Sequence, residues 1–482
     1  MTAFYQKSSF NAIPRRAAVE KTRRSVYNAL MNNELQSKFI KKYSKLMLDH
    51  GMIENDLYLK YEVKRGLRDI SGKGVLVGLT EISEVVAYII EDGDLVPCEG
   101  KLYYRGINIE KLTEGFLNEK RFGFEEACFL LLFGYLPNKE EFAEFMAIIE
   151  ESTELPENFV RDTIMSAPSK NMMNALSKGV LTLYAFDENP DDISVENVLR
   201  QSINLIAQFP LLAVYGYQSF SHFHDNKSLM IHPPQKGKSI AENILIMLRS
   251  DSNYTELEAR ILDIALVLHA EHGGGNNSTF TNHVVTSSHT DTYSTVVASL
   301  ASLKGPRHGG ANIKVVQMVR DMMENISNWN DDDEVTAYLE KLLNKEAFDK
   351  SGLIYGMGHA VYSLSDPRAV ILRQFVEQLA KEKGRNDEYN LYSKVEVLAP
   401  QVIGKVRKIY KGVSANIDFY SGFVYSMLDL PEEIFTPLFA IARVAGWGAH
   451  RLEELVNNGK IIRPAYKSVT KQRSYIPMSE RK

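Results

Sequence analysis

Apolar residues recur every three or four positions along most of the chain, which is the spacing that one face of an α-helix presents. Segment 258–269 is apolar nearly all round, as is typical of a helix that is buried on every side. Segments 311–323, 335–343 and 366–380 each carry one apolar stripe, and segment 432–447 is a further apolar helix. The pattern therefore predicts an all-α fold.

One region alternates instead of repeating at helical spacing. Val, Ile and Tyr residues alternate with other residues through positions 83–106, a period of two that is typical of β-strands. Asp92-Gly93 and Glu99-Gly100 interrupt this region at positions suited to tight turns. We therefore expect a minor β-hairpin region near the N-terminal part of an otherwise helical protein.

The length of 482 residues favours two domains, because a single hydrophobic core rarely serves so long a chain. Hydrophobic residues make up 44% and charged residues 24% of the sequence, which excludes a disordered or disulfide-rich chain. We expect a large helical domain formed by residues 1–309 and 430–482, and a small helical domain formed by residues 310–429.

Charge and cysteine content narrow the function classes. The formal net charge of −5 argues against a general nucleic-acid binder. No run approaches the roughly 18 consecutive apolar residues that a membrane helix requires, so we expect no membrane association. Cys98 and Cys128 are too few for a disulfide framework or a cysteine-based metal site, and they indicate a reducing compartment. We therefore expect a cytoplasmic location.

Residues 1–48 contain ten basic and two acidic residues. Such a segment is compatible with an organelle-targeting peptide. We favour an amphipathic helix on the folded body, because apolar residues recur there at helical spacing. These residues are Leu35, Phe39, Ile40, Tyr43, Leu46 and Met47.

Four of the eleven histidines lie in glycine-flanked segments. They are His269 and His272 in HAEHGGGN, His308 in GPRHGGAN and His359 in GMGHAVY. Glycine lets the backbone approach a ligand closely, so several such histidines indicate a functional site. A metal site is the alternative for His269 and His272, which are three residues apart. We expect no metal, because no HExxH motif, CxxC pair or nearby carboxylate cluster supplies further ligands.

Asp366-Pro367-Arg368 has the composition of a helix start, with Asp at the N-cap and Pro in the first turn. Arg368 would then lie at the positive end of a helix dipole, a position suited to binding an anion. The alternative is an ordinary surface ion pair with a carboxylate. Arg368 follows His359 by nine residues, so one loop can present both to an anionic ligand.

Asp418 lies within SANIDFYSGFVYSML, where apolar and aromatic residues surround a single carboxylate. Burial in such surroundings raises the pKa of a carboxyl group and makes it a stronger base. The same residue is equally suited to cap the helix that follows. The residues alone leave the general base and the helix cap as alternatives.

The ordered set of motifs resembles the citrate synthase family. The matching segments are HAEHGGGN, GPRHGGAN, GMGHAVY followed by DPR, NIDFYSG, IARVAGW and IIRP, in that order and at similar spacings. GLRDISGKGVLVGLTEIS, LYYRGINIEKL and FEEACFLLLFGYLP are similar to the family's bacterial N-terminal portion. The resemblance covers the chain from about residue 60 to the C-terminus and implies a citrate-synthase-like two-domain helical fold.

The resemblance implies an acyltransferase that condenses acetyl-CoA with oxaloacetate and water to give citrate and CoA. The coenzyme A thioester is then a substrate, and we expect no cofactor. By resemblance, Asp418 is the base that removes a proton from the acetyl methyl group, and His308 stabilises the enol. His359 polarises the ketone of oxaloacetate and protonates the alkoxide that forms.

The family's oxaloacetate ligands carry over residue by residue. His272, Arg368 and Arg443 match such positions, and guanidinium groups suit a dicarboxylate because they bind carboxylates bidentately. For Arg443, which lies in an apolar helix, the alternative is a buried ion pair. Arg463 matches a residue that in the family reaches the neighbouring subunit's site, which implies a homodimer. Glu271 stands where aspartate is common.

The resemblance also places coenzyme A against the loop 353–359, whose glycines would let backbone groups face the adenine. The residues concerned are Leu353, Gly356, Met357 and Gly358. The basic run 405–411 is a candidate for the phosphates of coenzyme A, with Lys411 at a family lysine position. A solvated helix face is the alternative for this run.

The residues leave other functions open. 2-Methylcitrate synthase, which uses propionyl-CoA, has the same site residues, and one methylene in a pocket is worth only about 1–3 kcal/mol. A non-catalytic ligand sensor on the same fold would be expected to lack Asp418 or His308, and both are present. A nucleic-acid binder that uses residues 1–48 would need a stacked aromatic motif or a recognition helix, and the sequence offers neither.

Overall fold

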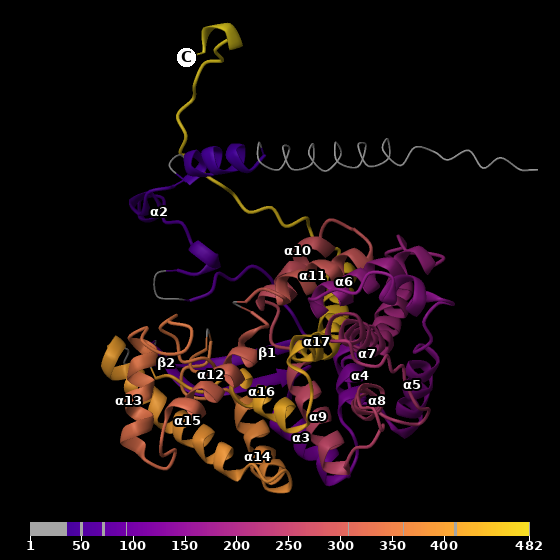
Figure 1. The fold of residues 1–482 in the computed structure, drawn as a ribbon. Helices are drawn as coiled ribbons and strands as arrows, with labels where there is room; N and C mark the ends of the chain where they lie inside the picture. Colours follow the sequence, from indigo (N-terminus) through magenta and orange to yellow (C-terminus); the bar gives the residue numbers. More distant parts are fainter. Residues whose placement is uncertain are drawn as a thin grey trace, which may run out of the picture. The chain divides into compact units, whose positions relative to one another are not determined.

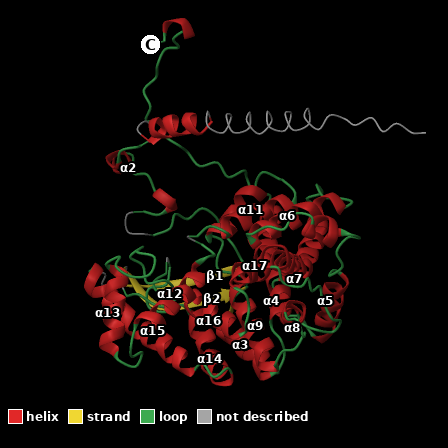
Figure 2. Cartoon of the chain, in the orientation of Figure 1, coloured by secondary structure: helices red, strands yellow, loops and turns green. Residues whose placement is uncertain are grey.

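The computed structural model describes residues 36–48, 52–69, 73–92, 94–306, 308–359, 361–408 and 412–481. The chain falls into two compact units, one ending at Gly78 and the other beginning at Leu79. Figure 1 colours the chain along its sequence, and Figure 2 colours it by secondary structure. The second unit carries all the residues that the sequence predicts for the site.

The first unit contains a helix over residues 36–48, the short helix α2 (Asn55–Lys60) and the turn η1 (Arg65–Leu67). This confirms a helix in the described part of the predicted amphipathic segment, while Leu35 lies outside the described residues. The side chains of the helix are exposed. Its packing on the folded body stays a prediction.

The second unit is built mainly of α-helices, which confirms the predicted fold class (Figure 2). Each of the five predicted helical segments coincides with an observed helix. The elements are α3 (Ile109–Asn118), α4 (Phe124–Phe133), α5 (Lys139–Glu151), η2 (Val160–Met165), α6 (Met172–Leu183), η3 (Tyr184–Phe186), α7 (Val195–Asp225), α8 (Ile240–Leu248), α9 (Glu256–His269), α10 (Asn277–Thr286), α11 (Thr292–Leu303), α12 (Ala311–Asn325), α13 (Asp332–Leu343), α14 (Pro367–Glu382), α15 (Asn386–Arg407), α16 (Ile417–Met427), α17 (Glu432–Val456) and η4 (Met478–Glu480).

The predicted β region forms a three-stranded antiparallel sheet in the order β1-β2-β3. Its strands are β1 (Ser83–Glu91), β2 (Asp94–Tyr104) and β3 (Ile107–Asn108). β1 ends at Glu91 and β2 begins at Asp94, where the first turn is expected, while Gly93 lies outside the described residues. The turn expected at Glu99-Gly100 is wrong, because both residues lie inside β2 and the next turn is at Arg105-Gly106.

Gly100 marks a bulge instead of a turn. Val86 pairs with Lys101 while Tyr88 pairs with Pro97, so β2 has extra residues at this point. A Cβ on Gly100 would lie 2.2 Å from the carbonyl oxygen of Ser365. The glycine therefore lets the loop before α14 pack directly on the sheet.

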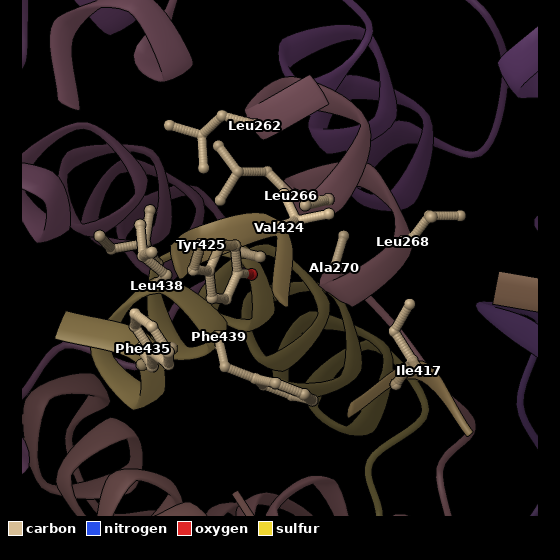
Figure 3. Packing of buried hydrophobic residues seen from close by; sticks show 14 of the residues in the cluster. Leu262, Leu266, Leu268, Ala270, Ile417, Val424, Tyr425, Phe435, Leu438 and Phe439 are labelled. Carbon is tan, nitrogen blue, oxygen red and sulfur yellow. The ribbon is translucent and has the colours of Figure 1, made fainter. Parts of the chain in front are cut away.

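Helix α9 lies in the hydrophobic core, and every residue from Ile261 to His269 is buried. Figure 3 shows Leu262 and Leu266 of α9 beside Val424 of α16 and Leu438 of α17. The prediction of a helix buried on every side is confirmed. As a result, the loop that follows His269 begins inside the protein.

None of the described helices combines the length and the apolar character that crossing a membrane requires. The predicted boundaries at 309/310 and 429/430 both fall within the second unit. The division into a large and a small helical domain therefore stays a prediction.

Candidate active site

Two predicted histidines meet beyond the end of α9, although 87 residues separate them in the sequence. The ring centroids of His272 and His359 are 5.2 Å apart, and the ring of Tyr362 lies 5.5 Å from His272 and 4.9 Å from His359. Gly100 in β2 allows Tyr362 to pack this closely on the sheet, since a Cβ there would be 2.6 Å from the tyrosine ring. The three rings form one wall of the candidate site.

The backbone fixes the proton position on neutral His359. Its Nδ1 accepts hydrogen bonds from the N–H groups of Val361 at 2.9 Å and Tyr362 at 3.1 Å. Because Nδ1 is an acceptor, the proton of the neutral ring is on Nε2. Neutral His359 is therefore a hydrogen-bond donor at Nε2.

His308 is held by Ser278, which the sequence reasoning did not single out. His308 Nε2 lies 3.0 Å from Ser278 Oγ, which also accepts a hydrogen bond from Trp447 Nε1 at 3.3 Å. Burial, and then the charge of Arg443, lowers the pKa of His308 to about 4. Burial and the charge of Arg443 therefore keep the imidazole neutral at neutral pH.

Arg368 lies at the start of α14 with Asp366 as its N-cap, as the sequence predicted. Asp366 binds the guanidinium bidentately, at 3.0 Å to Nε and 2.7 Å to the terminal nitrogen. The alternative of a surface ion pair is wrong, because both side chains are buried. Asp366 also accepts from Ile417 N at 3.2 Å, so it ties the start of α14 to the start of α16.

Asp418 lies in the first turn of α16. The cap of this helix is Asn416, whose side chain accepts from Asp418 N at 3.0 Å, so the helix-cap interpretation of Asp418 is wrong. Burial raises the pKa of Asp418 to about 6, although the charges of Arg368 and Arg443 act in the opposite direction. Its buried Oδ1 has no hydrogen-bond partner among the described residues. A carboxylate in this state is suited to accept a proton near neutral pH.

Arg443 is completely buried in α17. Its Nε donates to the carbonyl of His269 at 2.7 Å, while neither terminal nitrogen has a hydrogen-bond partner among the described residues. The predicted alternative of a buried ion pair is therefore not observed for this guanidinium. Burial lowers the pKa of Arg443 to about 10, so it remains a cation at neutral pH. An unpaired buried cation is costly, which indicates an anionic ligand.

The charges of these groups act on one another, as is expected of groups that lie near each other. Burial first, and then four neighbouring groups, lower the pKa of His272. Those groups are Arg368, His359, Arg443 and His308. The structure thus brings together six of the seven residues predicted for catalysis and oxaloacetate binding. The seventh, Arg463, is exposed in the segment after α17, and its place in a neighbouring subunit's site stays a prediction.

The glycine loop 353–359 pairs with the segment before α16. Gly358 N donates to the carbonyl of Ser414 at 2.7 Å, and Asn416 N donates to the carbonyl of Gly356 at 2.9 Å. These two hydrogen bonds fix the loop against the segment that leads into α16. The predicted contact of Leu353, Gly356, Met357 and Gly358 with coenzyme A stays a prediction, because the structure contains no ligand.

Gly356→Ala should destabilise the protein more than Gly384→Ala. Both glycines have a positive φ, of 79° and 67°, so both variants strain the backbone. At Gly356 the new Cβ would also lie 2.8 Å from Phe419 and Val315, whereas nothing lies within 4 Å at Gly384. We expect an additional loss of about 1–3 kcal/mol for Gly356→Ala, measured by urea unfolding. Equal losses of unfolding free energy in the two variants would show that the loop around Gly356 can shift to accommodate a Cβ.

The basic run 405–411 is only partly described. Lys405 pairs with Glu340 at 3.0 Å, and Arg407 donates to the carbonyl of Gly352. Lys411 lies outside the described residues. Phosphate binding by this run stays a prediction.

The described residues contain no group of three or more His, Cys, Asp or Glu side chains arranged to hold a metal ion. His269 is the last residue of α9 and has no hydrogen-bond partner for its ring nitrogens among those residues. Its ring stacks on Phe439, with centroids 4.3 Å apart. His272 lies beyond the end of the helix, so the two histidines do not share a helix face.

Comparison with known proteins matches residues 68–465 to the family model described as citrate synthase, C-terminal domain. The chain belongs to the citrate synthase family. Citrate synthase from Synechocystis is 36% identical over 386 residues, which cover 80% of this chain and 89% of that protein. 2-Methylcitrate synthase 1 from Corynebacterium glutamicum is 31% identical over 427 residues, which cover 87% and 99% of the two chains.

Solved citrate synthases have the same fold. The structure from Pyrobaculum aerophilum superposes with a TM-score of 0.69 at 30% identity, covering 85% of this chain and 95% of that chain. A ternary complex of the Thermoplasma acidophilum citrate synthase with carboxymethyl coenzyme A and oxaloacetate has a TM-score of 0.71 at 25% identity, covering 87% and 99%. The family membership and the helical fold implied by the motifs are confirmed. The chain is accordingly an enzyme of a family that transfers an acyl group in a condensation reaction.

Proposed function

We propose that the enzyme is a citrate synthase of the si type, which condenses acetyl-CoA with oxaloacetate and hydrolyses the thioester to give citrate and CoA. The observation that carries this proposal is the unpaired guanidinium of Arg443, buried within electrostatic reach of Asp418. A buried guanidinium with two nitrogens that lack hydrogen-bond partners, near a carboxylate of raised pKa, suits an anionic substrate that reacts through proton abstraction.

Oxaloacetate is the proposed anion. Its two carboxylates suit Arg368 and Arg443, with His272 as a further ligand and Arg463 contributed by a second subunit of a homodimer. His359 Nε2 is the donor that we assign to the ketone oxygen, where it would polarise the carbonyl and later protonate the alkoxide.

Acetyl-CoA is the proposed second substrate, and no separate cofactor is needed. Asp418 would remove a proton from the methyl group while neutral His308 donates a hydrogen bond to the forming enol oxygen. The Thermoplasma complex supports both ligands, since that relative is bound to a coenzyme A analogue together with oxaloacetate. The loop 353–359 and Lys411 remain the proposed coenzyme A contacts, and the cytoplasm the proposed location.

2-Methylcitrate synthesis is the second candidate, because relatives of that name match the chain nearly as well. A non-catalytic sensor is disfavoured, since Asp418 and His308 are both present and share one site.

The two enzymatic candidates are separated by CoA-thiol release with oxaloacetate and either acetyl-CoA or propionyl-CoA. We expect kcat/KM to be larger with acetyl-CoA, by about 10-fold or more if the pocket excludes one methylene. A larger value with propionyl-CoA would assign the enzyme to 2-methylcitrate synthesis. Absence of oxaloacetate-dependent release with either thioester would refute both.

A further inference from the structure

The segment 269–273 lies along one stripe of α17. Arg443, Gly446 and His450 recur on this stripe at intervals of three and four residues. Arg443 binds the last carbonyl of α9, and His450 Nε2 lies 3.2 Å from Oε1 of Glu271. A Cβ on Gly446 would lie 2.3 Å from Oε2 of Glu271, so the glycine makes the close approach possible.

Glu271 is completely buried and is anchored to the sheet on its other side. Ser83 of β1 donates to Glu271 Oε1 at 3.0 Å and accepts from Gly273 N at 3.1 Å. Tyr104 of β2 accepts from Glu271 N at 3.1 Å. The carboxylate and the backbone on both sides of His272 are therefore fixed by two strands.

A chain of hydrogen bonds leads from Glu271 back to α10. His450 Nδ1 lies 3.2 Å from His283 Nε2, and His283 Nδ1 lies 2.9 Å from Glu454. The two imidazoles thus connect Glu271 on one side with Glu454 on the other.

The charge of Glu271 also acts on the substrate site. Burial acts to raise the pKa of Glu271, but His450 and Arg443 hold it at about 2, so the side chain is ionised. Glu271 acts on Arg443 in turn: burial lowers the pKa of Arg443, and the charge of Glu271 is the largest of the effects that raise it.

We propose that Glu271, clasped between Ser83 and His450, is a positioning residue for oxaloacetate: it fixes the loop of His272 and balances the charge of Arg443. The inference rests on the proposed function, because it takes His272 and Arg443 as oxaloacetate ligands. In this proposal Glu271 acts through His272 and Arg443 and not on the substrate directly.

Glu271→Gln tests the proposal, because glutamine keeps an acceptor for Ser83 but removes the charge. We expect the KM for oxaloacetate to rise about tenfold or more, which is the effect of removing one partner from a buried polar contact. The value of kcat should change by less than about threefold. The KM for acetyl-CoA should be unchanged. Glu271→Asp, which keeps the charge, should restore much of the oxaloacetate affinity.

Glu258→Gln is the matched control. Glu258 is also a buried carboxylate in an ion pair, with Arg249 at 2.8 Å, but it belongs to the opposite end of α9. This variant should lose thermal stability without any change in the KM for oxaloacetate. A role of Glu271 in folding alone would make the two variants behave alike and would overturn the proposal.

The His450→Gln variant tests the same proposal even if the Glu271→Gln variant fails to fold. It should raise the KM for oxaloacetate similarly, and the double variant should be no worse than either single one, because both act through one contact. Additive effects would overturn the proposal, as would tight calorimetric binding of oxaloacetate to every variant. A wild-type protein that binds no oxaloacetate would instead refute the proposed function.

Discussion

Asp418→Asn should reduce kcat by about 10²–10⁴-fold, the usual cost of losing a general base, while oxaloacetate affinity stays near the wild-type value. The amide is nearly isosteric with the carboxylate but cannot accept the methyl proton. CoA-thiol release measures turnover, and calorimetry with oxaloacetate measures binding. Retention of most of the activity would remove Asp418 from the role of base.

The raised pKa of Asp418 adds a pH dependence to this prediction. The base is active when ionised, so wild-type kcat/KM should be lost as the pH falls through about 6. The folded state binds this proton more tightly than the unfolded state. The free energy of unfolding should therefore fall as the pH rises from 3.8 to about 6, by up to about 3 kcal/mol. The Asp418→Asn variant lacks this titration. In urea unfolding, its free energy of unfolding relative to that of the wild type should therefore increase over the same pH range.

Arg463→Ala and Asp418→Asn, each inactive alone, should restore activity when their subunits are exchanged. In a heterodimer, one site receives Asp418 from one subunit and Arg463 from the other, and the second site carries both lesions. Each heterodimer should then have about half of the wild-type activity. Random exchange makes half of all dimers heterodimers, so the mixture should reach about a quarter.

Differently tagged subunits allow the heterodimer to be isolated and its formation to be verified. Exchange between two tagged Asp418→Asn chains is the control and should yield no activity. Isolated heterodimers of the two variants that remain inactive would show that Arg463 acts in its own subunit. A chain that is monomeric in solution would exclude the shared site as well.

The sequence predicts the helices well because the signals for them are local. Asp331 and Asp366 cap their helices as their positions before the apolar stripes indicate, and segment 258–269 is buried on all sides. Short motifs predict the site residues, and several of them lie at or near the ends of helices, as His272, Arg368 and Asp418 do. The motifs identify the residues of the site, but they do not indicate which contacts those residues make.

The errors arise where two residues compete or where distant segments meet. Asn416 and Asp418 are both good caps, and only the backbone decides that Asn416 starts the helix. Glu99-Gly100 looks like a turn, but the register of β1 against β2 makes it part of a bulge. Ser278 and Tyr362 matter through contacts with the rings of the site, and no local spacing indicates them.

The two buried arginines differ in what they present to an arriving ligand. Asp366 binds the guanidinium of Arg368 bidentately, whereas Arg443 donates only to the carbonyl of His269, and its two terminal nitrogens have no hydrogen-bond partner among the described residues. We therefore expect Arg368 mainly to orient a bound dicarboxylate, and Arg443 to contribute more of the electrostatic attraction. The site is thus asymmetric, because Asp366 fixes the orientation of one guanidinium while the other keeps two nitrogens available for a ligand.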